Sequence, residues 1–240
     1  MKLSARRLRR LPAVVLPQVP QHAWLLDAVR RFDPDAAPVE EGGISFGAGI
    51  RLAGPQRITP EMAAKTGLPP GHAWVASDNG PFQTWLARGL AARFGGHAHL
   101  PQPVVADDAS EVVIVHTPRK VSADELAARL NRLVPGLVVG SPEQDGSFFL
   151  TSAISPVRIR CDSPDVPSLR WLLPLALGPM RQEPALHGYR FGRVPDRADD
   201  ATNVRLAAAA ALELAHGVGG VATDRDRFRV FDPDDPALYR

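Results

Sequence analysis

Cysteine is almost absent from this chain of 240 residues: Cys161 is the only one. A single thiol excludes an internal disulfide and any zinc site that needs several cysteine ligands. The composition is therefore typical of a reducing compartment, and we expect a cytoplasmic protein.

Long apolar runs and a strong charge imbalance are missing as well. No window reaches the ~18–20 apolar residues that a membrane span requires, and the formal net charge is only +2. Aromatic residues make up 6% of the chain, so it lacks the interleaved aromatics of an RNA-binding sheet. What remains is the composition of an ordinary soluble globular protein.

One phrase is present twice. Residues 85–97 and 209–221 each read as an apolar helix that runs into Gly-Gly and a short strand. A left-handed residue that favours glycine commonly ends a helix in this way. The repetition predicts a duplicated domain, although helix–Gly-Gly–strand is also a common local motif.

The order of expected elements supports the same interpretation. Hydrophobic periodicity and caps predict strand–helix–strand, a helical insertion, and strand–helix–strand in each half. The expected strands are 11–16, 43–52, 72–77, 97–100, 111–117, 137–140, 147–152, 157–161, 189–194, 221–223 and 227–231, and the main helices are 21–32, 81–94, 122–133 and 199–216.

This order predicts an α+β chain of two fused ferredoxin-like (βαββαβ) units from an internal duplication. Each unit is expected to be an antiparallel sheet with its helices on one face. The predicted domains are residues 1–103 and 110–240, joined by a proline-rich acidic segment, with a helical insertion at about 164–178 in the second. One continuous α+β domain is the alternative.

Two surface features are candidate binding sites. Arg6, Arg7, Arg9 and Arg10 are candidate phosphate contacts, because arginine offers a planar fork of donors; a solvated N-terminus is the simpler reading. The apolar run 171–177, with Trp171, Leu172 and Leu175, is too hydrophobic to lie bare on a monomer. It predicts a domain interface, a homodimer contact or a protein partner.

No motif for catalysis or for a cofactor outweighs its structural explanation. His97 and His99 share one side of a strand without a third metal ligand, and Gly47-Ala-Gly49 lacks the third glycine of a dinucleotide loop. Cys161 has no histidine partner nearby in sequence. The acidic residues Asp78, Asp199, Asp200, Asp224 and Asp226 are explained by helix caps and a hairpin turn. We therefore expect no catalytic residue, no metal and no cofactor.

The tryptophans and two phenylalanines are expected in the core, since they lie on the apolar faces of the proposed elements. They are Trp24, Trp74, Trp85, Trp171, Phe82 and Phe94.

Three functions remain open. The first is a non-catalytic macromolecule-binding protein: an adaptor, a regulatory subunit or a toxin-neutralising protein. The second is a small-molecule enzyme or sensor with a pocket between the halves, lined by His72, His97 or His116 together with Asp78 and Arg158. The third is RNA binding through the arginine-rich N-terminus.

Overall fold

In the computed structural model the chain is α+β, with two compact units, Met1–Val105 and Ala106–Arg240. The structure describes residues 4–47, 49–102, 110–142, 144, 147–161, 187–193 and 201–239. The run 171–177, the acidic pair at 199–200 and the expected insertion therefore lie outside the described residues. Among the described residues, no helix has the length and apolar character needed to cross a membrane.

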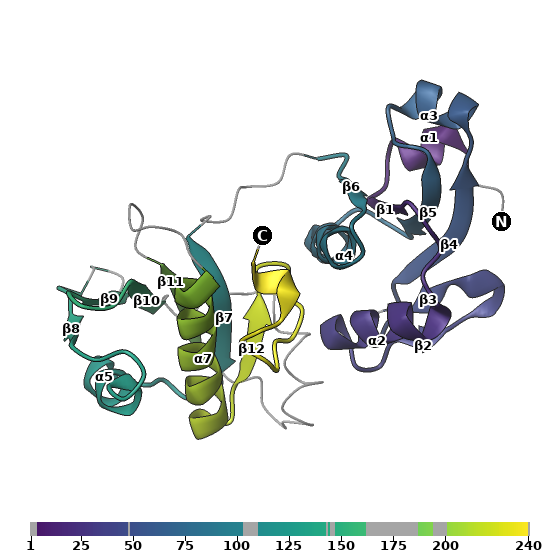
Figure 1. Ribbon diagram of the computed structural model, residues 1–240. Helices are drawn as coiled ribbons and strands as arrows, with labels where there is room; N and C mark the ends of the chain where they lie inside the picture. The colour runs from purple at the N-terminus through teal and green to yellow at the C-terminus, as the bar shows by residue number, and fades with distance from the viewer. Residues whose placement is uncertain are drawn as a thin grey trace. The chain divides into compact units, whose positions relative to one another are not determined.

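The first unit is built on a six-stranded antiparallel sheet with the order β2-β3-β4-β5-β1-β6 (Figure 1). Its elements are α1 (Ala5–Leu8), β1 (Ala13–Leu16), α2 (His22–Phe32), β2 (Ala37–Pro38), the 3-10 turn η1 (Glu40–Gly42), β3 (Ile44–Ser45), β4 (Arg51–Ile58), α3 (Pro60–Thr66), β5 (Gly71–Ala76), α4 (Pro81–Arg93) and β6 (His97–His99).

The second unit has another six-stranded antiparallel sheet, with the order β12-β7-β11-β10-β9-β8. Its described elements are β7 (Glu111–Thr117), α5 (Ala123–Leu130), β8 (Leu137–Val139), β9 (Phe148–Ser152), β10 (Val157–Cys161), β11 (His187–Arg193), α7 (Ala201–Val218), β12 (Val221–Asp224) and the 3-10 turn η3 (Pro236–Leu238).

The two sheets follow the same path. In each, the first strand lies between the last and the fifth, and the fourth, third and second strands continue outward. The register agrees as well: Val14 of β1 pairs with Trp74 of β5, and Val115 of β7 pairs with Tyr189 of β11. Among the described residues, Trp74 and Tyr189 are the two largest fully buried side chains, so each unit places its largest described core residue at the same point of its sheet.

Both Gly-Gly pairs end their helices in the same way. Gly95 (φ 62°) and Gly219 (φ 68°) adopt the left-handed conformation. The N–H of Gly96 then donates to the carbonyl of Ala91 (2.6 Å), and that of Gly220 donates to Ala215 (2.8 Å). These are the capping bonds of a Schellman motif.

The second glycine of each pair lies directly against the first strand of its sheet. A Cβ atom on Gly96 would stand 2.6 Å from the carbonyl oxygen of Val15, and one on Gly220 would stand 2.8 Å from that of His116. The next residue of each pair begins the edge strand, which is paired to this same first-strand residue. The repeated phrase therefore has one structural role in both units.

The faces of the first sheet correct the expectation that all helices lie on one side. Leu8 of α1 and Met62 and Ala63 of α3 pack with Val15 and Val75. The alternate residues of these strands point to the other face, where α4 packs on β1. Figure 1 shows α1 and α3 next to each other. The cause is that β1 and β5 are apolar at consecutive positions, so both faces must be covered.

In the second unit, α5 and α7 share one face of the sheet. Leu126 and Leu130 of α5 and the alanine-rich side of α7 form one buried cluster with Val113, Val115 and Tyr189. Figure 1 shows α7 lying along β7. The alternate positions of β9, β10 and β11 therefore point away from these helices.

Several local expectations need correction. The expected strand 43–52 is a hairpin and not one straight strand: the N–H of Phe46 donates to the carbonyl of Ile50 (2.9 Å), and Gly49 between them has a positive φ of 75°. Trp24 is 61% exposed and lies outside the core, whereas Trp74 and Phe82 are buried. The N-cap of α4 is Gly80, not Asp78, whose carboxylate instead accepts from the Gln83 amide.

Candidate functional site

The face of the second sheet that points away from α5 and α7 carries a group of cationic and aromatic side chains. We name it the Arg face and define it by Phe149 of β9, Arg158 and Arg160 of β10, and Arg190 of β11. The strand alternation places these residues together, because their chain neighbours Phe148, Leu150, Val157, Ile159, Tyr189 and Phe191 belong to the core on the other side.

The register brings the three arginines into one patch. Arg160 pairs directly with Phe149 on one side and with Arg190 on the other. The guanidinium carbon of Arg158 lies 4.3 Å from the centroid of the Phe149 ring, and that of Arg160 lies 5.6 Å from it. Both distances are within the range of a cation–π contact, so the ring holds the two cations near each other.

Arg190 is held by a carboxylate. Its guanidinium lies 2.7 Å from Glu111 of β7, and the two side chains are 22% and 9% exposed. One charge of the patch is therefore matched, while Arg158 has only its contact with Phe149 among the described residues. Glu111, Phe149, Arg158, Arg160 and Arg190 line a small hollow with a cavity volume of about 30 Å³. The described lining of this hollow carries three arginines and one glutamate.

An exposed apolar side chain extends this face toward the edge of the sheet. Val138 of β8 is 64% exposed and pairs with Thr151 of β9, an exposed position on the same side as Phe149. From the edge inward the face thus runs from apolar to aromatic to cationic. This combination resembles the core of many protein interfaces, where aromatic residues and arginine are enriched.

The buried histidine near this face is not available as a base. His116 of β7 is fully buried, and its Nε2 lies 3.2 Å from the hydroxyl of Thr223. Burial, together with the nearby positive charges of Arg227 and Arg190, lowers the pKa of His116 to about 3. The imidazole is therefore neutral at physiological pH and shielded from any substrate.

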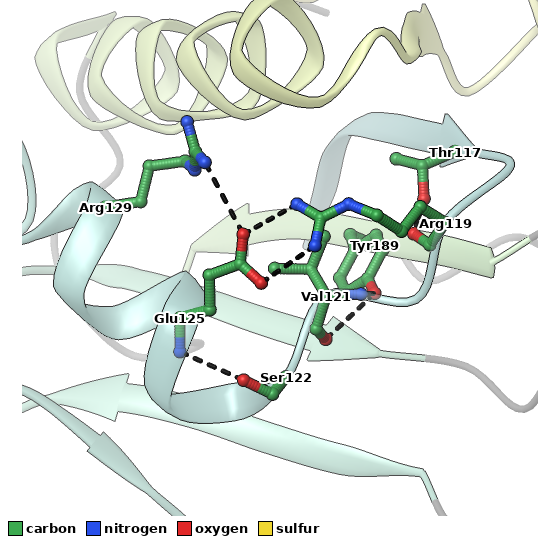
Figure 2. A network of polar contacts seen from close by, with 7 residues as sticks. All are labelled: Thr117, Arg119, Val121, Ser122, Glu125, Arg129 and Tyr189. Carbon is green, nitrogen blue, oxygen red and sulfur yellow. Dashed lines mark hydrogen bonds and ion pairs between the residues drawn. The ribbon is translucent and has the colours of Figure 1, made fainter.

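The helix side of this unit holds a polar network rather than a site. Figure 2 shows the Tyr189 hydroxyl reaching the backbone of Val121: it accepts from the N–H (2.6 Å) and donates to the carbonyl (3.0 Å). Glu125 forms a two-bond ion pair with Arg119 (3.1 and 2.6 Å) and is 3.5 Å from Arg129. These contacts hold the segment between β7 and α5.

Ser122-Ala-Asp-Glu125 at the start of α5 is typical of a capping box in sequence, and the structure forms half of it. The hydroxyl of Ser122 accepts from the N–H of Glu125, as expected. The Glu125 carboxylate pairs with Arg119 rather than with the cap, and the hydrogen bond from Arg119 lowers the pKa of Glu125. Burial raises the pKa of Tyr189 above its ordinary value.

The other predicted site residues are not brought together. Arg6, Arg9 and Arg10 are exposed around α1, while Leu8 between them is fully buried. Cys161 is buried beside Tyr189 in the core. His97 and His99 are on β6, and no group of three metal-ligating side chains occurs among the described residues. Trp171, Leu172 and Leu175 lie outside the described residues.

The Asp224 carboxylate has a structural role that the sequence anticipated. It accepts from the N–H groups of Asp226 (2.9 Å) and Phe228 (3.0 Å) and so holds the turn after β12. The sequence alone does not reveal the Arg face, because its residues are spread over three strands. The alternation of Phe149, Arg158, Arg160 and Arg190 with core residues was the available signal.

Comparison with known proteins gives no relative: no family model, no curated protein and no solved structure matches this chain.

Proposed function

We propose that the chain is a duplicated pair of ferredoxin-like units. A βαββαβ sheet has its last strand beside its first, with a helix after the first strand and another before the last. Both units follow this plan with one further hairpin between the helices. The matching registers of Val14 with Val115 and of Gly96 with Gly220 support a common origin.

We propose further that the protein acts by binding another protein, not by catalysis, and that the Arg face receives an acidic surface of that partner. The observation that carries this proposal is the placement of Arg158 and Arg160 around the Phe149 ring, with Arg190 opposite Arg160 on the next strand. Arginine binds carboxylates through a planar fork of donors. Phe149 and Val138 add apolar surface, and burying this surface against the partner would favour binding.

The titratable groups near the face agree with a binding role. His116 is neutral and enclosed, and Cys161 is 1% exposed, so neither offers a base or a nucleophile to a substrate. An adaptor, a regulatory subunit or a toxin-neutralising protein of the cytoplasm would work in this way. On sequence grounds, Trp171, Leu172 and Leu175 are proposed as a second, apolar contact with a partner or with another copy.

The test is capture of interacting proteins by the full-length chain. We expect a partner with an acidic surface to be recovered with wild type and lost with the double variant Arg158→Glu/Arg160→Glu. Arg132→Glu, at an exposed position after α5, is the matched control. Recovery of the partner should decrease as the salt concentration is raised from ~50 to ~500 mM, because salt screens exposed charges. Equal recovery with all three proteins would refute the role of the Arg face.

RNA binding through the N-terminus is separated by a second arm. Leu8 is part of the core, so deletion of residues 1–10 would damage the fold; substitution of Arg6, Arg9 and Arg10 by Gln avoids this. Retention on heparin that drops with these substitutions, but not with the Arg158 and Arg160 changes, would favour the RNA alternative. Unchanged retention would dispose of it.

A further inference from the structure

A second hollow lies in the first unit and is independent of the partner proposed above. Its cavity volume is about 420 Å³. It is lined by Arg7, Val39, Glu40, Gly43, Arg51, Leu52, Ala53, Gly54, Pro55, Gln56 and Ser77. A volume of this size is typical of small-molecule pockets, which span ~300–1,000 Å³.

The register shows that this hollow and the hollow of the Arg face occupy equivalent places in their sheets. Leu52 of β4 pairs with Ala76 of β5, and Ile159 of β10 pairs with Phe191 of β11. Trp74 is two residues before Ala76, and its counterpart Tyr189 is two residues before Phe191, so the two strand pairs align without a shift.

One residue further, an arginine occupies the same position in both units. The N–H of Ser77 donates to the carbonyl of Arg51 (2.8 Å), and the N–H of Arg51 donates to the Ser77 hydroxyl (3.1 Å). In the second unit Arg158 pairs with Gly192 at this point. Arg51 and Arg158 are thus equivalent, and each lines the hollow of its own unit.

The surroundings of the two arginines differ. Arg158 lies on an aromatic ring, whereas Arg51 is exposed and makes no side-chain contact among the described residues. Arg7 of α1 supplies a second cation to the first-unit hollow, and Glu40 supplies one anion. Val39 and Pro55 add apolar surface beside these charges. The described lining of the hollow therefore places two arginines and one glutamate beside an apolar wall.

We propose that this hollow binds a small organic anion, a carboxylate or phosphate carried on an apolar body. Arg51 holds the anionic group through charge-assisted hydrogen bonds, and Arg7 lines the same hollow. The apolar body of the ligand packs on Val39 and Pro55. The first unit would then be a ligand-binding unit, and the second a partner-binding one.

The probe is 8-anilinonaphthalene-1-sulfonate, an anion on an apolar body whose fluorescence rises in an apolar site. Titration of the full chain should show saturable binding. Arg51→Gln should weaken it about tenfold, as expected for losing a hydrogen bond to a charged group. The dye affinity of Arg51→Lys should lie between those of wild type and Arg51→Gln, because lysine keeps the positive charge but not the planar fork of donors.

Two controls make the result specific. Arg57→Gln removes an exposed arginine of the same strand that does not line the hollow, so it should bind the dye like wild type. Displacement by 2-naphthoate and not by the neutral 2-naphthalenemethanol is also expected. The proposal fails if Arg51→Gln binds the dye as tightly as wild type, or if Arg57→Gln loses as much dye affinity as Arg51→Gln. It also fails if the neutral 2-naphthalenemethanol displaces the dye as well as 2-naphthoate does. Capture of a protein partner by the Arg face is unaffected by any of these outcomes.

Discussion

The two units share a strand order and a register, but they differ in what lies on the second face of the sheet. In the first unit Val15 and Val75 lie under α1 and α3. The equivalent positions in the second unit are His116 and Arg190. Val15 and His116 each follow the first-strand residue of the matched pairs Val14–Trp74 and Val115–Tyr189, and Val75 and Arg190 each follow the fifth-strand residue. In the first unit these positions are apolar and lie under helices, whereas in the second they are a buried neutral histidine and an arginine paired with Glu111. One architecture thus supports two kinds of surface.

The largest expected effect comes from exchanging one such position. Val75→Arg would place an unpaired cation beneath α1 and α3 and should destabilise the first unit by about 3–5 kcal/mol. The reverse change, Arg190→Val, should cost less, because Arg190 is 22% exposed and its pair with Glu111 is partly solvated. Chemical denaturation of both variants measures the difference, and equal losses would contradict the contrast between the faces.

The large core residues of the two units should differ in a related way. Tyr189→Phe leaves both the N–H and the carbonyl of Val121 without their partner and should cost about 2–4 kcal/mol. Trp74→Phe removes no hydrogen bond, since the indole N–H has no partner among the described residues. Its cost should be the smaller one, from lost volume alone. A larger loss for Trp74→Phe in thermal denaturation would show that the Val121 bonds contribute little.

His116 should make the second unit sensitive to acid. Its folded pKa of about 3 lies below the unfolded value of 6.5, so the unfolded state binds the proton first. Stability should therefore be lost as the pH falls below about 6.5, by about 1.4 kcal/mol per pH unit. In His116→Val, which installs the residue of the first unit, this dependence should disappear. Hydrogen exchange of β7 against pH measures it, and parallel profiles would exclude His116 as the cause.

The smallest effects concern the Gly-Gly pairs, where the units should behave alike. Gly96→Ala and Gly220→Ala each push a methyl group into a backbone oxygen and should cost about 1–3 kcal/mol. Gly95→Ala and Gly219→Ala meet no atom within 4 Å and should cost only about 1 kcal/mol for the positive φ. Thermal melts of the four variants test this equivalence. It would be refuted if Gly96→Ala and Gly220→Ala, or Gly95→Ala and Gly219→Ala, lost different amounts of stability.

Local structure was predictable where one short segment supplies all the interactions. Thr59 caps α3 and Gly67 ends it, and Ser122 caps α5, each as its sequence indicates. The α+β class was also predictable from the order of helical and strand periods, and both sheets are antiparallel. The six-strand count was not. In the first unit β2 and β3 are only two residues long and carry no period, and in the second unit the expected strand 227–231 forms only an isolated bridge at Arg229.

Expectations from the sequence are wrong where a contact between distant residues determines the structure. Helical spacing predicts Trp24 in the core, but the spacing does not say how wide the buried side of α2 is, and Trp24 is exposed. The segment 43–52 alternates like a strand, yet Gly49 turns the chain so that β3 and β4 pair with each other. The Arg face needed the register of three strands before its residues could be recognised as neighbours.

The amino-acid sequence by itself determined the chain's alternation of helices and strands and the ends of those helices, because backbone conformation and capping bonds involve residues within a few positions of each other. Only the tertiary structure decided which side of each strand is covered and which side chains meet across strands. Those outcomes depend on pairing and packing between residues far apart in the chain, and local preferences do not encode them.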